Sequence, residues 1–205
     1  MELKEALAEL RKNEKKKFDQ SIDLIVNLKG IDIKRENISA IINIPHRFKE
    51  KKVCGFLTKK SALVTTITQP EFQKYRDKKE LKKLAKKFDF FLAVAPLMPA
   101  VATTFGKVLG PSGKMPSPQL GIVAPENDEE IKKVLDKISK SIKVRAKEAS
   151  IKTSIAKESM KDEEIMENIQ AAYRTIVDAL PTKKENVRNV MIKFTMSKPI
   201  KVEMK

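Results

Sequence analysis

The chain has 205 residues, of which 41% are hydrophobic and 34% charged, so it can build one large or two small cores and is too apolar for wholesale disorder. Its 43 lysines and arginines against 27 aspartates and glutamates give a net charge of +16, which points first to nucleic acid and then to an anionic membrane surface. No apolar stretch reaches the roughly 18 residues of a membrane span, and the first residues lack a signal-peptide core, so we expect a cytoplasmic protein with no membrane partner.

The first fifty residues predict a helix and two strands. Residues 1–17 alternate charge with leucine as a helix does, and they end in three lysines. From residue 18 the period changes to two, which predicts a half-buried strand to residue 28. One face of that strand carries Phe18, Gln20, Ile22, Leu24, Val26 and Leu28. A second strand is expected over 38–44, and the charge run 50–52 marks a candidate linker.

The pattern of apolar residues changes in the middle of the chain. Short apolar runs at 53–58 and 90–95 are typical of strands buried on both faces. Helical spacing predicts helices over 71–88 and from Asn127 or Asp128 to about residue 139, with a short apolar stretch at 120–123 between them. This alternation favours a small α/β unit with a mainly parallel sheet.

The last third returns to the style of the first. Residues 151–155 alternate, 162–180 form the clearest amphipathic helix, and a last strand is expected over 187–196. Neither end of the chain looks complete alone. We therefore predict an α+β domain I built from both ends, 1–51 and 148–205, with an α/β domain II, 52–147, inserted between them.

A glycine- and proline-rich segment, 105–119, stands out because both residue types are scarce elsewhere. It predicts a shaped, non-helical, basic loop of the kind that meets phosphate. The nucleotide-binding P-loop does not fit, since Val108 stands where that motif has glycine and Met115 where it has Ser or Thr.

The sequence offers no candidate residues for catalysis or for metal binding. The chain has one histidine, His46, beside a proline, and one cysteine, Cys54, which are too few for a zinc site or a catalytic triad and exclude an intrachain disulfide. The carboxylates are interleaved with lysines, as on solvated helix faces. We expect no catalytic residue, no metal and no cofactor, and therefore no enzyme.

The sequence offers better candidate residues for nucleic-acid binding, although aromatic residues are only 5% and Trp is absent. This composition disfavours base stacking as the main mode and favours recognition of the backbone and shape of a folded RNA. Candidate contacts are Lys15 to Phe18 and the tail 193–199; the alternatives are a core role for Phe18 and an ordinary basic turn at the tail. The basic face of 74–87 fits a solvated or steering surface better than a specific one.

The segment Gly106-Lys107-Val108-Leu109-Gly110-Pro111-Ser112-Gly113-Lys114-Met115-Pro116-Ser117-Pro118 resembles the signature of the large-subunit ribosomal protein L1 family, found at the side stalk of the ribosome. Lys17-Phe18-Asp19, Ile44-Pro45-His46, 151–157 and Thr195-Met196 recur in the family's order. The resemblance covers nearly the whole chain, and its length and short N-terminus look more like the archaeal branch than the bacterial one.

The resemblance implies a split first domain that carries the main site for 23S-type rRNA and an inserted Rossmann-like second domain. By position, the site would include Lys17, Phe18 and Ser21, then Lys157, then Thr195, Met196 and Ser197. The resemblance also implies a monomer off the ribosome that aids release of deacylated tRNA from the exit site and represses its own mRNA. The alternatives are an off-ribosome translational repressor and a nucleotide-binding enzyme.

One position departs from the family's pattern. The family usually has glycine after Thr-Met, where backbone lies close to RNA, and this chain has Ser197. If the position requires a positive φ, serine costs on the order of 1 kcal/mol. A serine hydroxyl could instead donate to a phosphate.

Overall fold

The computed structural model describes residues 1–12, 16–32, 36, 38–75, 77–118, 120–124, 127–146 and 148–204. The chain folds as two compact units. Unit 1 combines Met1–Lys49 with Lys140–Lys205, and unit 2 is Glu50–Ser139. Unit 1 is mainly antiparallel and unit 2 is parallel, so the mixed α/β fold class is confirmed.

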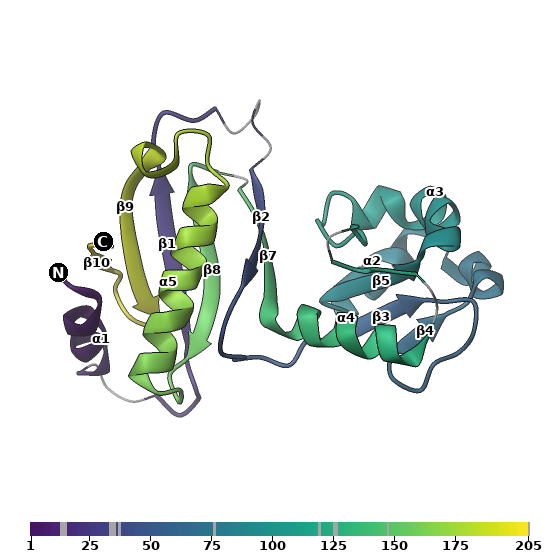
Figure 1. Ribbon diagram of the computed structural model, residues 1–205, viewed down its shortest axis with the longest axis horizontal. Helices are drawn as coiled ribbons and strands as arrows, with labels where there is room; N and C mark the ends of the chain where they lie inside the picture. The colour runs from purple at the N-terminus through teal and green to yellow at the C-terminus, as the bar shows by residue number, and fades with distance from the viewer. Residues whose placement is uncertain are drawn as a thin grey trace. The chain divides into compact units, whose positions relative to one another are not determined.

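Unit 1 is built on a four-stranded antiparallel sheet in the order β10-β9-β1-β8. Its strands are β1 (Ser21–Leu28), β8 (Ser150–Lys157), β9 (Val187–Phe194) and β10 (Ile200–Val202). The long helix α5 (Asp162–Asp178) lies across one face of this sheet, and α1 (Leu3–Arg11) lies beside β10 (Figure 1). The two ends of the chain are adjacent, since the Glu203 N–H donates to the Met1 carbonyl at 3.0 Å.

The core of unit 1 follows the alternation of its strands. Ile22, Leu24 and Val26 are fully buried, while the residues between them are only partly covered. They pack in one cluster with the apolar stripe of α5, which includes Ile165 and Ile169. The predicted period of two is therefore confirmed over 21–28, but the strand begins at Ser21 and not at residue 18.

A second, two-stranded sheet completes unit 1. β2 (Ser39–Asn43) pairs antiparallel with β7 (Ser141–Arg145), and α5 contacts β2. The units divide at 49/50 and 139/140, whereas the expected boundaries were 51/52 and 147/148. Residues 141–145 group with unit 1 because their hydrogen-bonding partner is β2.

Unit 2 contains a four-stranded parallel sheet in the order β4-β3-β5-β6. Its strands are β3 (Val53–Phe56), β4 (Thr65–Ile67), β5 (Phe90–Val94) and β6 (Ile122–Val123). One face packs against α2 (Lys78–Lys87) and α3 (Met98–Leu109), and the other against α4 (Asp128–Lys140). Helices on both faces explain why β3 and β5 show continuous apolar runs.

The single helix expected over 71–88 is wrong. The segment forms a 3-10 helix, η1 (Gln69–Tyr75), followed by α2. Asp77 separates them because its carboxylate accepts the Lys79 N–H at 3.1 Å and caps the N-terminus of α2. The helical spacing of the apolar residues continues across this break, so the sequence pattern alone could not reveal that the segment forms two helices. Two short 3-10 turns, η2 (Ala95–Leu97) and η3 (Lys183–Asn186), complete the elements.

The expectation of a non-helical loop from residue 105 is also wrong at its start. Residues 105–109 form the last turns of α3, including Gly106. A glycine inside a helix costs roughly 0.5–1 kcal/mol relative to alanine. Burial of Phe105 offsets this cost, because its ring lies 4.6 Å from that of Phe56 and 5.1 Å from that of Phe72. Tertiary packing thus overrides local propensity here.

Candidate nucleic-acid interface

Three strand ends meet at one edge of the unit 1 sheet. Because β1 runs antiparallel to both neighbours, its start lies beside the ends of β8 and β9 (Figure 1). Ser21 is paired with Lys157, and Ile22 with Phe194. The sheet therefore gathers the predicted site residues, which come from three separate parts of the sequence. We call this cluster the strand-end edge: Lys17, Phe18, Ser21, Lys157, Thr195, Met196 and Ser197.

Thr195 continues the sheet one residue beyond β9. Its N–H donates to the Ser21 carbonyl at 3.1 Å, and its hydroxyl both accepts the Ser21 N–H and donates to the Ser21 carbonyl at 3.2 Å. The side chain nevertheless stays exposed. Ser21 and Thr195 thus form one hydrogen-bonded unit at the surface.

Ser197 holds the turn that follows. Its hydroxyl accepts the Phe194 N–H at 2.8 Å and lies 3.3 Å from the carbonyls of Phe194 and Lys198, either of which takes its proton. Among the described residues, Lys183 is the only residue other than glycine that has a positive φ. Ser197 therefore carries no backbone strain of this kind. The hydroxyl already has intramolecular partners, which opposes its expected role as a phosphate ligand.

Two large apolar side chains project from the strand-end edge. Phe18 is 52% exposed and Met196 is 67% exposed. Within the described ranges, Met1 and Leu63 are the other large hydrophobic residues that lie open to solvent. The alternative in which Phe18 belongs to the core is therefore wrong. An aromatic ring and a thioether held at the surface suit contact with another molecule.

Two lysines add positive charge to this edge. Lys17 is exposed. Lys157 donates from Nζ to the Asp19 carbonyl at 3.1 Å and lies 4.0 Å from the Asp19 carboxylate. The Asp19 carboxylate also accepts the N–H and the hydroxyl of Ser159, both at 3.0 Å. Asp19 thus ties the segment before β1 to the turn after β8.

Asp19 and the buried Gln20 were missed as site residues. Gln20 is only 3% exposed, although the residue before it is exposed and the residue after it is half-buried. The available signal was its place on the predicted apolar face of the strand. A glutamine at such a position needs hydrogen-bonding partners inside the protein.

Lys114, in the glycine-proline segment of unit 2, has a structural role. Lys114 Nζ donates to the carbonyls of Ala85 and Phe88 at 2.8 and 2.7 Å, at the C-terminal end of α2. An ammonium there satisfies carbonyls that have no partner within the helix. Lys114 is therefore not presented to a phosphate, contrary to the expectation from sequence.

Two glycines of this region have conformations that other residues rarely adopt. Gly113 has φ +70° and Gly121 has φ +126°. A Cβ at Gly121 would lie 2.9 Å from the Phe91 carbonyl. These glycines shape the connection from α3 to β6, and each conformation has a reason within unit 2.

The described residues contain no group of three or more His, Cys, Asp or Glu side chains that could hold a metal ion. His46 Nε2 lies 2.7 Å from a carboxylate oxygen of Glu167 at the surface. Cys54 is buried, and desolvation raises the pKa of its thiol to about 12. None of the helices in the described ranges is long and apolar enough to cross a membrane.

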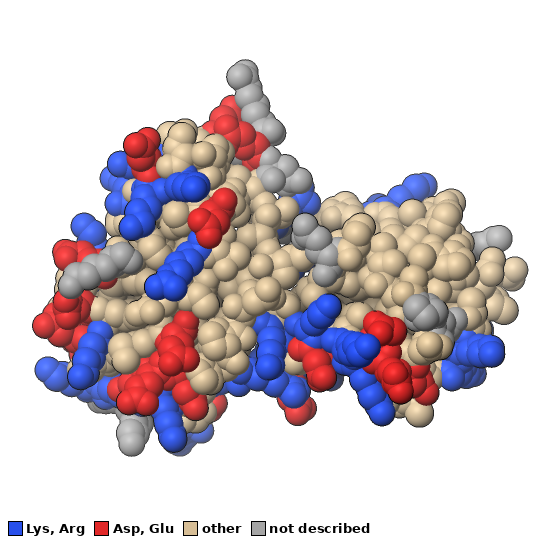
Figure 2. Space-filling view, viewed as in Figure 1, with Lys and Arg blue, Asp and Glu red and all other residues tan. Residues whose placement is uncertain are grey.

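Basic and acidic side chains are interspersed over the visible face of unit 1, whereas on unit 2 they gather mainly along the lower margin of the view and much of the face is uncharged (Figure 2). The net charge of +16 gives a general attraction to anions, and the strand-end edge gives the local shape. Together these features define a class: a basic α/β protein with two compact units and one surface edge of mixed polar and apolar character.

The comparisons with known proteins agree with this class. The model of the ribosomal protein L1p/L10e family matches residues 10–198. The large ribosomal subunit protein uL1 of Pyrobaculum calidifontis is 34% identical over 95% of this chain and 89% of its own length. Those of Pyrococcus horikoshii and Thermofilum pendens are 33% and 35% identical, over 97% and 98% of this chain and 94% and 90% of their own lengths.

The chain belongs to the ribosomal protein L1p/L10e family. It is a structural ribosomal protein of the cytoplasm and not an enzyme. The resemblance drawn from the glycine-proline segment is thus confirmed, although that segment serves the internal structure of unit 2.

Proposed function

We propose that the strand-end edge of unit 1 binds rRNA of the large ribosomal subunit at the side stalk. The observation that carries this proposal is the joint exposure of Phe18 and Met196 beside Thr195, Lys17 and Lys157. The curated relatives are named as proteins of the large ribosomal subunit, which supports the choice of partner.

The chemistry of the edge suits a folded RNA. Lysines neutralise phosphates, and their contacts make affinity fall as salt rises. Hydroxyl and main-chain groups match ribose 2′-hydroxyls and phosphates across the shallow minor groove of RNA. Phe18 and Met196 supply contacts with ribose and base faces that require a defined RNA shape.

Two finer roles follow from the same edge. An interface that recognises backbone and shape accepts any RNA that folds into the same form, including a segment of the protein's own mRNA, so we include repression of that mRNA. The positive charge of unit 2 fits a part in handling exit-site tRNA, to which it would add long-range attraction. The nucleotide-binding alternative loses its support, since Lys114 is engaged with Ala85 and Phe88.

The test is binding to a folded stalk-rRNA fragment, titrated over salt, for the wild type and the double variant Thr195→Ala/Met196→Ala. We expect a loss of about 30-fold to 150-fold, since two contacts of about 1–1.5 kcal/mol each are removed. Leu63→Ala, which truncates an exposed apolar side chain of unit 2, is the matched control and should bind as the wild type.

Equal binding of the double variant and the wild type would place the interface elsewhere. Binding that unrelated competitor RNA abolishes would leave only a generic basic protein. Co-sedimentation with large subunits at high salt separates a resident ribosomal protein from an off-ribosome repressor.

A further inference from the structure

Gln20 is a buried polar residue at the centre of the strand-end edge. Its side-chain Nε2 donates to a carboxylate oxygen of Glu158 at 3.1 Å, and its Oε1 accepts the N–H of Met196 at 3.2 Å. Its backbone carbonyl accepts the Glu158 N–H at 2.8 Å. One side chain thus joins the segment before β1 to the turns that follow β8 and β9.

The orientation of the Gln20 amide is fixed by its partners. A backbone N–H can only donate, and it therefore requires the amide oxygen. A carboxylate can only accept, and it therefore requires the amide NH₂. Exchanging the two ends of the amide would oppose donor to donor and acceptor to acceptor. Glutamine meets both demands with one side chain, at 3% exposure.

The hydrogen bond between Gln20 and Met196 holds the more exposed of the two apolar residues of the strand-end edge. The turn from Phe194 to Ser197 is closed internally by the Ser197 hydroxyl, which fixes its shape. That internal bond does not attach the turn to the rest of the edge at Met196. The bond from Met196 to Gln20 does so, and Thr195 provides a second attachment through Ser21.

We propose that Gln20 is a positioning residue for RNA binding, which holds the Met196 turn and the Glu158 turn in the arrangement that the RNA meets. This inference rests on the proposed function of the strand-end edge. Gln20 itself is too buried to touch RNA, so its effect passes through the two turns. The Glu158 turn is also anchored by Arg11, whose Nη1 donates to the Glu158 carbonyl at 3.3 Å, and Gln20 is the side chain that bonds to both turns.

The first experiment compares Gln20→Leu with a matched buried variant at the opposite end of the same sheet. Asn186 is 6% exposed; its side chain accepts the Thr182 N–H at 2.8 Å and donates to the Lys29 carbonyl at 3.3 Å. Asn186→Leu therefore removes a comparable buried amide and loses stability without touching the strand-end edge. Both variants are assayed at a temperature where each is fully folded.

We expect Gln20→Leu to bind the stalk-rRNA fragment about tenfold more weakly, the effect of roughly one lost hydrogen bond at the edge. Asn186→Leu should bind within about twofold of the wild type, as a change remote from an interface does. The Met196 amide should exchange with deuterium faster in Gln20→Leu and at the wild-type rate in Asn186→Leu.

A second variant, Gln20→Glu, gives a readout that loss of stability alone would not produce. At neutral pH its carboxylate would face that of Glu158 at hydrogen-bonding distance, with Asp19, Lys157 and Arg11 as the other charged residues nearby. Protonation of one carboxyl restores a donor to Glu158 and leaves an oxygen for the Met196 N–H. RNA affinity of Gln20→Glu should therefore recover as pH falls from about 9 to about 5.5, while the affinity of Gln20→Leu relative to the wild type stays constant.

The outcomes separate this inference from the proposed function. If Thr195→Ala/Met196→Ala weakens binding and Gln20→Leu does not, the edge binds RNA and Gln20 does not position it. A Gln20→Glu variant that binds like the wild type up to pH 9 also overturns the inference. If none of the edge variants affects binding, the proposed function fails and the inference fails with it.

Discussion

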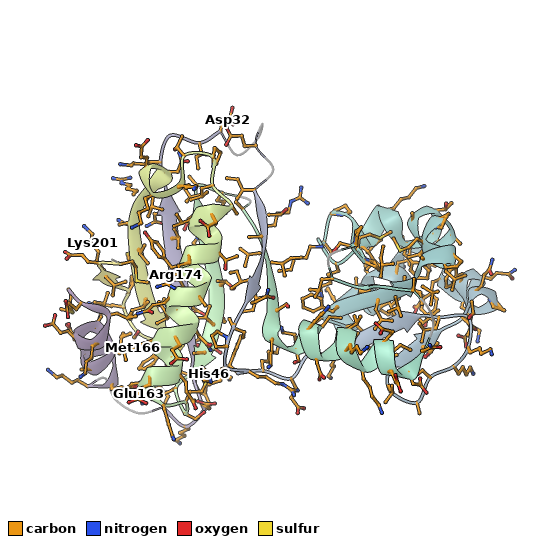
Figure 3. The ribbon with its side chains drawn as sticks, viewed as in Figure 1. Asp32, His46, Glu163, Met166, Arg174 and Lys201 are labelled. Carbon is orange, nitrogen blue, oxygen red and sulfur yellow. The ribbon has the colours of Figure 1, made fainter. Side chains whose placement is uncertain are left out.

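Asn168 is the residue whose replacement should most clearly destabilise unit 1. It lies on α5 and is fully buried. Its side-chain oxygen accepts the His46 N–H at 2.9 Å, and its NH₂ donates to the carbonyls of His46 at 2.9 Å and Ile155 at 3.0 Å. It thereby joins α5 to the segment after β2 and to β8. His46 lies beside the lower half of α5 in Figure 3.

The magnitude follows from these three hydrogen bonds. Each contributes a net of about 1 kcal/mol, so Asn168→Ala should lower the free energy of unfolding of unit 1 by about 3 kcal/mol. This corresponds to an unfolding equilibrium constant about 150-fold larger. Asn168→Leu fills the space but offers no partner and keeps water out. It should therefore cost more than Asn168→Ala, because each of the three backbone groups left unpaired costs about 1–3 kcal/mol.

The assay is native-state hydrogen exchange read by mass spectrometry on segments of α5 and β8. Segments of unit 2 in the same experiment serve as an internal control and should not change. Glu167→Gln is the matched surface control. It removes only the exposed pair with His46, whose members are 36% and 61% exposed, and should cost less than about 1 kcal/mol. The reasoning is refuted if Asn168→Leu is more stable than Asn168→Ala, since lost volume and not lost hydrogen bonding would then dominate.

Three further predictions concern unit 2. Lys114→Met removes the ammonium from the Ala85 and Phe88 carbonyls and should lower the free energy of unfolding by about 1–2 kcal/mol in urea unfolding. Lys107→Met, which replaces an exposed lysine on α3, should change the free energy of unfolding by less than about 0.5 kcal/mol. Equal effects of the two substitutions would contradict the capping role of Lys114. The Cys54 thiol, with its pKa raised to about 12 by burial, should resist a thiol reagent at pH 8 until the protein unfolds, and rapid labelling of the native protein would contradict its burial. Because the folded pKa lies above the ordinary value of 9.0, the contribution of this thiol to stability is complete below pH 9 and falls as pH rises toward 12, a slope that Cys54→Ala should lack in pH-dependent urea unfolding.

Much of the secondary structure could be predicted from periodicity. The alternation over 21–28 and the stripe of α5 gave correct elements, since one face of each is buried against a common core. β4 and β10, of three residues each, and helix α3, of twelve residues, were not predicted. The two strands are too short to show a period, and α3 runs into the glycine-proline segment that was expected to be a loop.

The candidate site could be predicted only in part. The resemblance supplied seven residues from three segments, and the sheet register brings those segments together. Pattern alone could not decide whether Phe18 is buried, because a residue just before a strand fits the alternation in either case. The strand starts at Ser21, and the ring is left exposed.

The sequence by itself determined the family, the basic character and the alternation of buried and exposed positions, because these depend on residue identity and local spacing. The tertiary structure decided the roles of Gln20, Asn168 and Lys114, because each role is defined by partners distant in sequence. It also decided that residues 141–145 group with unit 1, since the pairing of β7 with β2 joins segments about a hundred residues apart. A polar side chain acquires its function from the groups that it meets, and only the folded chain specifies those groups.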